Sequence, residues 1–289
     1  MDLPLLDRIK RLAITAMVSD DELMELLVLK GGNAIDIVYQ LSGRASVDLD
    51  FSMQYEFNKE DLDKIKVKVE KALNNTFAQE GMKVFDVKLV ERPSNIAEEY
   101  KDFWGGYEID FKVMPEKLYS EKVGNLDALR RSATIVGLAQ KRTFKIDISK
   151  FEYCTEKSKS EINGYTVYVY TPEMLVLEKI RSICQQIPDY KEIVKSHSPV
   201  PRARDFFDIY LVLEAFPFDI NSERIFTLLN HVFEAKRVPL SFINKISDQR
   251  EFHRIDFASV KDTIRSGVEL KEFDFYFDYV VNILKSIKC

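Results

Sequence analysis

The chain has 289 residues, of which 46% are hydrophobic and 31% are charged. This much apolar area can offset the entropy lost on folding, so the composition excludes an intrinsically disordered chain. The 42 Lys and Arg residues against 47 Asp and Glu residues give a formal net charge of −5, which excludes a uniformly basic nucleic-acid-binding protein.

The sequence also bears on location. It holds no uncharged apolar stretch of about 20 residues, so we expect no transmembrane span and no membrane partner. The first residues, Met1-Asp2-Leu3-Pro4, carry an acid where a secretory leader carries a base. Cys154, Cys184 and Cys289 are far apart and indicate neither a disulfide framework nor a metal site. We therefore expect a cytoplasmic protein.

The first 45 residues are predicted to be helical. Apolar residues recur at helical spacing in residues 5–13. The acids at 20–22 suit the start of a second helix, which is predicted to run through Lys30. Gly31-Gly32 interrupts the helical pattern, which resumes after it.

Alternation of apolar and polar residues predicts a sheet in the middle of the chain. Strands are expected at residues 47–53, 83–91, 107–114, 143–153 and 165–170, the last entered through a turn at Gly164. Helices are expected between them at residues 59–80 and 121–141.

After Pro172 the sequence predicts helices and connectors only. Thr171-Pro172-Glu173 is typical of a helix start, with proline in the first turn. The predicted helices are 172–186, 203–215, 221–236, 239–249, 257–266 and 272–287. We therefore predict an α+β fold, with a mixed or mostly antiparallel sheet flanked by helices in a domain of residues 1–171 and a helical bundle domain of residues 172–289.

Asp48 and Asp50 are the first candidate site residues. On a strand, residues two apart project from the same face, so the two carboxylates should lie side by side. Their mutual repulsion would be relieved by a hard divalent ion such as Mg²⁺. Upstream, Gly31-Gly32 at a helix N-terminus would let the backbone approach a phosphate. Each motif alone is weak, since either occurs as a solvent-facing strand or a plain turn, but their ordered combination predicts phosphoryl or nucleotidyl transfer.

A third carboxylate on a neighbouring strand would complete a two-metal site. Asp147 and Asp110 both lie in alternating strands, and we prefer Asp147 because its flanks are apolar in the way those of Asp50 are. In the helical half, Lys179 lies in an apolar helix, where a lone lysine usually extends its amine to solvent. Asp205 and Asp208 open the helix after a proline-rich loop, and helix capping is the simple explanation for either.

Residues 116–145 form a locally basic segment in an otherwise acidic chain. Seven Lys and Arg residues face three acids there, a balance of +4. A solvated helix face explains this balance, and a surface for a phosphate backbone is the alternative.

The motifs together resemble the AbiEii/AbiGii toxin family, nucleotidyltransferases of the DNA-polymerase-β-like superfamily. The resemblance covers residues 25–215, and its motifs occur in the family's order. They are Leu29-Lys30-Gly31-Gly32-Asn33-Ala34, then Arg44, Ser46 and Asp48-Leu49-Asp50-Phe51, then Ile146-Asp147-Ile148, Glu178-Lys179 and Arg204-Asp205-Phe206-Phe207-Asp208. Two features depart from the family: Asn33 replaces its usual Thr or Ser, and residues 116–141 are an insertion, which leaves the choice between Asp110 and Asp147 open.

The resemblance implies a nucleotidyltransferase fold and a set of site residues. The nucleoside triphosphate would be bound by Lys30, Gly31, Gly32, Asn33, Ser46 and Lys179, with the β- and γ-phosphates on Gly31, Gly32 and Asn33. Magnesium would be bound by Asp48, Asp50 and Asp147. Lys179 would contact the triphosphate, and Asp205 would orient this lysine or assist the acceptor.

The resemblance also implies a reaction and partners. An acceptor hydroxyl would attack the α-phosphorus and release pyrophosphate, and related toxins use the 3′ end of tRNA as acceptor and so stop translation. A cognate antitoxin protein would then be a partner. A protein or small-molecule acceptor, or a nucleotide-binding module without turnover, are the alternatives. No residue in the sequence identifies the base of the nucleotide.

Overall fold

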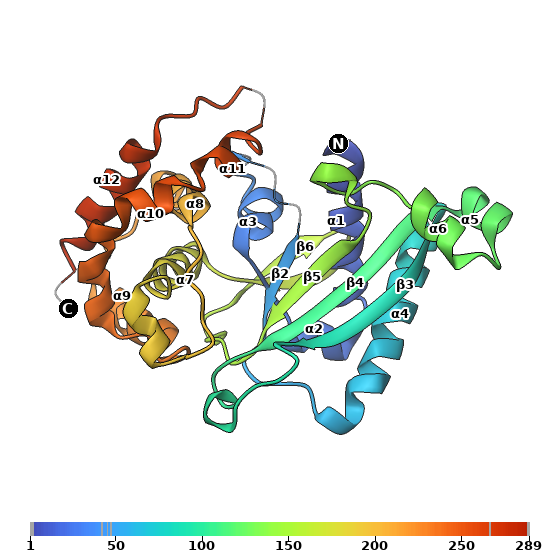
Figure 1. Cartoon of the computed structure of the whole chain (residues 1–289), viewed down its shortest axis with the longest axis horizontal. Helices are drawn as coiled ribbons and strands as arrows, with labels where there is room; N and C mark the ends of the chain where they lie inside the picture. Colours follow the sequence, from blue (N-terminus) through green and yellow to red (C-terminus); the bar gives the residue numbers. More distant parts are fainter. Residues whose placement is uncertain (1–2, 42, 45, 47, 266, 288–289) are drawn as a thin grey trace.

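The computed structural model describes residues 3–41, 43–44, 46, 48–265 and 267–287. The predicted strand 47–53 and helix 257–266 include Val47 and Ser266, which lie outside the described residues, as does Cys289. Within the described part, one seven-stranded sheet is followed in the chain by a group of helices (Figure 1).

The sheet has the order β3-β4-β5-β2-β1-β7-β6. Its strands are β1 Val28–Lys30, β2 Leu49–Ser52, β3 Met82–Arg92, β4 Gly106–Pro115, β5 Phe144–Ser149, β6 Ser158–Ile162 and β7 Tyr165–Val169. The pairs β2–β5 and β1–β7 are parallel and the other pairs are antiparallel. The sheet is therefore mixed, which confirms the predicted fold class.

Helices of the first half cover one face of the sheet. These are α1 Leu3–Val18, α2 Asp21–Leu26 and α4 Leu62–Ala78, and α4 lies behind β3 and β4 (Figure 1). The glycine pair begins α3 Gly31–Asn33, which continues as the π-helix η1 Ala34–Val38. Two short helices, α5 Glu116–Lys122 and α6 Leu126–Ser132, lie at the far end of β3 and β4 from the helical half (Figure 1).

The helical half begins at α7 Pro172–Cys184, where the Thr171 side chain accepts a hydrogen bond from the Met174 N–H and caps the helix. It continues with α8 Ala203–Ala215, α9 Glu223–Glu234, α10 Arg250–Arg254, α11 Phe257–Lys261 and α12 Phe273–Leu284. Residues 188–192 and 240–249 form 3₁₀ helices, η5 and η6. In the described part of the chain, no helix is long and apolar enough to cross a membrane.

Two predictions of secondary structure were wrong, and one strand was missed. Residues 28–30 form a central strand and not the end of a helix. The apolar residues 26–29 that lead into Lys30 have no alternation that would separate a buried strand from a helix. The helix predicted at 121–141 ends at Ser132, and Ala139 has a left-handed backbone. Strand β6 was not predicted, and its residues alternate between buried and exposed only weakly.

A single hydrophobic core runs from α1 through the sheet to α12. A smaller cluster, centred on Phe85 and Leu129, packs α6 onto β3 and β4. The division into domains at residue 171 stays a prediction, because side chains of both halves belong to the same core.

Candidate active site

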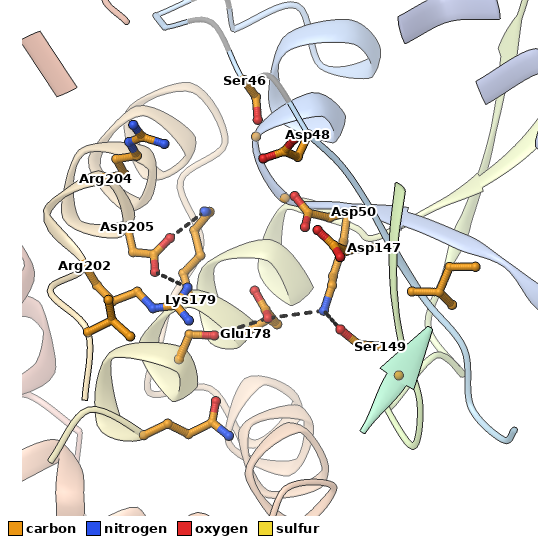
Figure 2. Close-up of a pocket in the computed structure, with 18 of the residues that line it drawn as sticks. Ser46, Asp48, Asp50, Asp147, Ser149, Glu178, Lys179, Arg202, Arg204 and Asp205 are labelled. Carbon is orange, nitrogen blue, oxygen red and sulfur yellow. Dashed lines mark hydrogen bonds and ion pairs between the residues drawn. The ribbon is translucent and has the colours of Figure 1, made fainter. Parts of the chain in front are cut away.

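A cleft of about 990 Å³ separates the sheet from α7 and α8. Residues from both halves line it, and they include nine of the ten predicted site residues (Figure 2). These nine are Lys30, Gly31, Gly32, Ser46, Asp48, Asp50, Asp147, Lys179 and Asp205. Asn33 is the exception. Its side chain is fully buried and donates a hydrogen bond to the backbone oxygen of Asp48 at 2.6 Å, so it holds the carboxylate loop in place.

The carboxylates lie together because of the sheet register. Asp50 on β2 is directly opposite Asp147 on the parallel strand β5, so both side chains project from one face. Burial, together with the charge of Asp147 and against that of Lys30, raises the pKa of Asp50 to about 7. Burial and the charges of Asp48 and Glu108 raise the pKa of Asp147. Asp48 was predicted to lie within this strand, but the structure places it just before β2.

The choice between Asp147 and Asp110 is a matter of position. Asp110 lies opposite Lys145 on β5 and is absent from the residues that line the cleft. The residue of β4 beside Asp147 is Glu108, whose carboxylate is held by Lys145 and Arg92. The structure therefore brings Asp147, and not Asp110, next to Asp50.

The two glycines allow close approach between the loop and the carboxylates. Gly31 has a φ of +68°, and a Cβ there would lie 2.7 Å from the Asp50 carboxylate. A Cβ on Gly32 would lie 3.1 Å from the Ser46 side chain. Any larger residue at position 31 would therefore force Asp50 or the loop to move.

Lys179 is held between two carboxylates on the helical wall. Its Nζ lies 2.9 Å from Asp205 and 2.8 Å from Asp208. Burial alone would lower the pKa of Lys179, but the two carboxylates outweigh it and raise that pKa. Asp205 uses Oδ1 for this contact, whereas its buried Oδ2 has no hydrogen-bond partner among the described residues and lies 3.5 Å from Arg202. In the described part of the chain, this oxygen is therefore held by the Arg202 ion pair alone.

A buried network of charges below the carboxylates was not predicted from the sequence. Lys30 contacts Ser149 at 3.1 Å and the carboxylates of Glu152 and Glu178, each at 3.5 Å. Arg181 pairs with the same two glutamates (Figure 2 shows Glu178 and Ser149). The i,i+3 spacing of Glu178 and Arg181 on one helix was the only signal in the sequence. The remaining members come from segments far apart in the chain.

Most of the basic segment 116–145 is engaged by the protein itself. Arg130 pairs with Asp86, Lys145 with Glu108 and Lys141 with Asp48, and Arg142 donates to the backbone oxygen of Ala133. The positive balance of the sequence therefore does not translate into an equal number of free cations.

The carboxylates of the cleft are the candidate metal ligands. Among the described residues, no group of three or more His, Cys, Asp or Glu side chains is placed so that it could hold a metal ion as it stands. The donor chemistry nevertheless fits a divalent cation, since Asp50 and Asp147 are adjacent carboxylates and the charge of Asp147 helps to raise the pKa of Asp50. Asp48, the third carboxylate, is paired with Lys141 at 2.9 Å.

Comparison with known proteins decides the family. Residues 13–279 match the family described as Nucleotidyl transferase AbiEii toxin, Type IV TA system. The chain belongs to the AbiEii toxin family. This confirms the resemblance inferred from the motifs, and it makes the chain a nucleotidyltransferase of a toxin–antitoxin family. No match to a curated protein is found.

Solved structures support the AbiEii fold. A Helicobacter pylori protein provisionally assigned as a nucleotidyltransferase shares 16% identity at a TM-score of 0.51, over 97% of this chain and 93% of that one. The H. pylori protein JHP933 shares 16% identity at a TM-score of 0.51, over 99% of this chain and 91% of that one. At this identity, the likeness shows the shared fold alone.

Proposed function

We propose that this AbiEii protein uses Mg²⁺ to transfer a nucleoside monophosphate from a nucleoside triphosphate to the 3′ end of tRNA. The observation that carries the proposal is the pair Asp50 and Asp147, opposite each other on parallel strands and facing the cleft. Gly31 lies so close to Asp50 that a bound phosphate would meet the backbone and the carboxylates together.

Three carboxylates would hold the metal ions in this proposal. Asp48 and Asp50 would bind one ion, and Asp147 would complete a second site. Bound Mg²⁺ would neutralise the triphosphate and stabilise the charge that develops on the α-phosphoryl group. Lys141 would have to leave Asp48 or share it, because the two side chains are paired at 2.9 Å.

Other groups that line the cleft would bind the triphosphate and the acceptor. Gly31 and Gly32 would receive the β- and γ-phosphates through backbone N–H groups, with Ser46 beside them. Lys179 lies on the opposite wall, where its amine would contact the triphosphate. Asp205, which contacts Lys179 at 2.9 Å, would orient this lysine or assist the acceptor.

The proposed reaction is a single displacement at the α-phosphorus of the nucleoside triphosphate. The acceptor hydroxyl oxygen forms the new bond to the α-phosphorus, the bond from that phosphorus to the bridging oxygen breaks, pyrophosphate leaves, and the hydroxyl proton passes to solvent. Deprotonation of the acceptor hydroxyl would be favoured by the site that Asp147 completes.

Cationic side chains at the mouth of the cleft support a nucleic-acid acceptor. Arg92 on the sheet side and Arg202 on the helical side both line the cleft, with 59% and 43% of their side chains exposed. Charges on both walls suit a strand whose phosphates pass between them. The segment 116–145 contributes less to this argument because Arg130 and Lys145 do not line the cleft, whereas Lys141 does.

A transfer assay tests the proposal. Purified protein with Mg²⁺ would be incubated with total tRNA and each α-labelled nucleoside triphosphate in turn, with Asp48→Ala alongside. We expect label on tRNA with the unmodified protein and none with the variant. Label on a protein or a small molecule instead would reject the RNA acceptor but retain the chemistry. Nucleotide binding without any transfer would leave only a binding module.

The toxin role is tested separately. The family is one of toxin–antitoxin systems, so we propose that a cognate antitoxin counteracts this chain. Induced expression should stop growth and protein synthesis, and Asp48→Ala should remove the effect. Growth arrest by both forms would show that toxicity does not come from nucleotidyl transfer.

A further inference from the structure

The register of the sheet gives the cleft a direction. Lys30 on β1 lies opposite Asp50 on β2, while Val28 lies opposite Ser52. The chain at Gly31 therefore continues from Asp50 in the direction away from Ser52. A triphosphate that has its terminal phosphates at the glycines and its α-phosphorus at the carboxylates would direct its nucleoside toward the Ser52 end.

That end of the cleft has an aromatic and an amide wall. Ser149 lies two residues beyond Asp147 on β5, about 7 Å further along the strand. Gly106 on β4 lies opposite Ser149, and Trp104 comes two residues before Gly106. On the opposite wall, Gln185 ends α7. All of these residues line the cleft, so a ribose would have room between the carboxylates and Trp104.

Trp104 is positioned to stack on a flat ring. The indole is partly exposed and packs against Phe103, Tyr190 and His197, with ring centroids 6.5, 6.1 and 6.1 Å away. These contacts are tilted or T-shaped, and no described ring stacks parallel on the indole. The surrounding rings therefore fix the indole, and no other aromatic ring of the described residues is stacked on its face.

Gln185 has an amide whose orientation is fixed. Its Oε1 accepts from Arg181 at 3.1 Å, and Arg181 can only donate. Its Nε2 donates at 3.2 Å to the hydroxyl of Tyr190, which itself donates to the backbone oxygen of Lys236 at 2.7 Å. A flipped amide would break both contacts. Within the described ranges, these contacts leave one N–H and one lone pair of the amide for a ligand, and Gln185 lines the cleft.

We propose that Trp104 and Gln185 form the nucleobase subsite of the cleft, Trp104 by stacking and Gln185 by reading the polar edge of the base. Tyr190 contacts both residues and so holds them in one fixed arrangement. The inference rests on the proposed function and adds to it the part of the site that selects the nucleotide.

Tryptophan fluorescence reports on this subsite directly, because Trp104 is the only tryptophan in the chain. Each nucleoside triphosphate would be titrated into the full chain with Mg²⁺, and inorganic tripolyphosphate would be the probe without a base. We expect the nucleotides to quench the emission and tripolyphosphate to bind by calorimetry without quenching it. A nucleotide that binds by calorimetry but leaves the emission unchanged would overturn the subsite, as would quenching by tRNA alone.

Substitutions separate stacking from reading. Trp104→Ala should raise the KM for every nucleotide about ten-fold, whereas Trp104→Phe should retain most of the affinity. Gln185→Met should reduce the preference for the best over the worst nucleotide about ten-fold. An unchanged preference, or equal use of all four nucleotides by the unmodified protein, would reject the role of Gln185.

The neighbouring Gln186 provides the matched control. Its amide is buried and engaged by Ser182 and Val200 within the protein, and it does not line the cleft. Gln186→Met should lower stability without changing base preference. If neither nucleotides nor tripolyphosphate bind, the proposed function itself fails, and this result is distinct from failure of the base subsite alone.

Discussion

Arg44 and Asp208 form a buried, two-pronged ion pair that joins the loop before β2 to α8. Arg44 donates through Nε and Nη2 to the two carboxylate oxygens at 2.8 and 2.6 Å. The same carboxylate lies 2.8 Å from Lys179 on α7. Burial would raise the pKa of Asp208, but the charges of Arg44 and Lys179 outweigh it and lower that pKa to about 2. One carboxylate therefore fixes a cation from each wall of the cleft.

We predict that Asp208→Asn destabilises the protein strongly. The substitution leaves Arg44 and Lys179 buried with one formal charge too few between them, and such broken buried pairs typically cost about 3–5 kcal/mol. Urea unfolding followed by circular dichroism would measure the loss. Nucleotidyl transfer should also fall, because Lys179 loses one of its two anchors.

The control for this variant is Asp278→Asn at the surface. Asp278 pairs with Arg250 on the exposed side of α12, where 54% of its side chain is accessible. Solvent screens such a pair, so we expect a change within about 0.5 kcal/mol. Equal losses of unfolding free energy in the two variants would mean that the buried ion pairs stabilise the protein no more than the surface pair does.

Asp147 and Asp110 were the two candidates for the third carboxylate, and substitution of each distinguishes them. Asp147→Asn keeps the shape of the side chain but removes the charge opposite Asp50, so the transfer rate should fall by at least about 100-fold. Asp110→Asn, which changes a side chain away from the cleft lining, should leave the rate within about three-fold of the unmodified protein. Initial rates with one labelled nucleotide would measure both. A larger loss in Asp110→Asn would reverse the assignment.

We predict that Gly31→Ala abolishes transfer. Its left-handed backbone is unfavourable for alanine by about 1–2 kcal/mol, and the added Cβ would lie 2.7 Å from the Asp50 carboxylate. The clash displaces a carboxylate that the reaction needs, so activity should be lost while much of the fold remains. The transfer assay and a thermal melt of the same sample would separate the two effects.

Gly164→Ala isolates the backbone contribution. Gly164 also has a left-handed φ, of +80°, but nothing lies within 4 Å of an added Cβ in the β6–β7 turn. The variant should lose about 1 kcal/mol of stability and retain full activity. A Gly31→Ala protein that keeps its activity would show that the cradle tolerates a side chain.

Local patterns in the sequence predicted the carboxylates but not their neighbours. Alternation identified the strands around Asp50 and Asp147, and apolar flanks favoured Asp147 over Asp110. The register that places them side by side comes from the parallel pairing of β2 with β5. Pairing between strands almost 100 residues apart is set by the packing of the whole sheet, which no local period encodes.

The nucleobase subsite and the buried charges were harder to predict for the same reason. Trp104 lies in the connection between β3 and β4, and Gln185 ends a helix, so neither lies in a motif. Lys236 contacts the backbone of Phe103 and Lys150 only after α9 has packed against α7. Apolar content misled in one place, because the run at 26–29 has no polar residue and was read, together with Lys30, as part of a helix.

His253 makes stability depend on pH at the mouth of the cleft. The imidazole is fully buried, and its Nδ1 accepts from the backbone N–H of Arg202 at 3.0 Å. Burial, partly opposed by the charge of Asp205, lowers the pKa of His253 to about 4. The unfolded chain therefore binds more protons than the folded one between pH 6.5 and 4, and stability falls as pH falls through this range.

We predict a loss of about 3 kcal/mol from this one group when the pH drops from 7 to 4. His253→Asn retains an acceptor for the Arg202 N–H but cannot be protonated, so the variant should be less stable at pH 7 and less sensitive to acid. Urea midpoints at pH 7, 5.5 and 4.5 for both proteins give the two slopes, and protonation of the carboxylates common to both cancels in the difference. Equal changes of stability with pH in the two proteins would contradict this prediction. They would mean that a local opening of the Arg202 segment lets His253 be protonated without unfolding of the chain. Because Arg202 lines the cleft, such an opening would show as a loss of nucleotide affinity before any loss of folded protein.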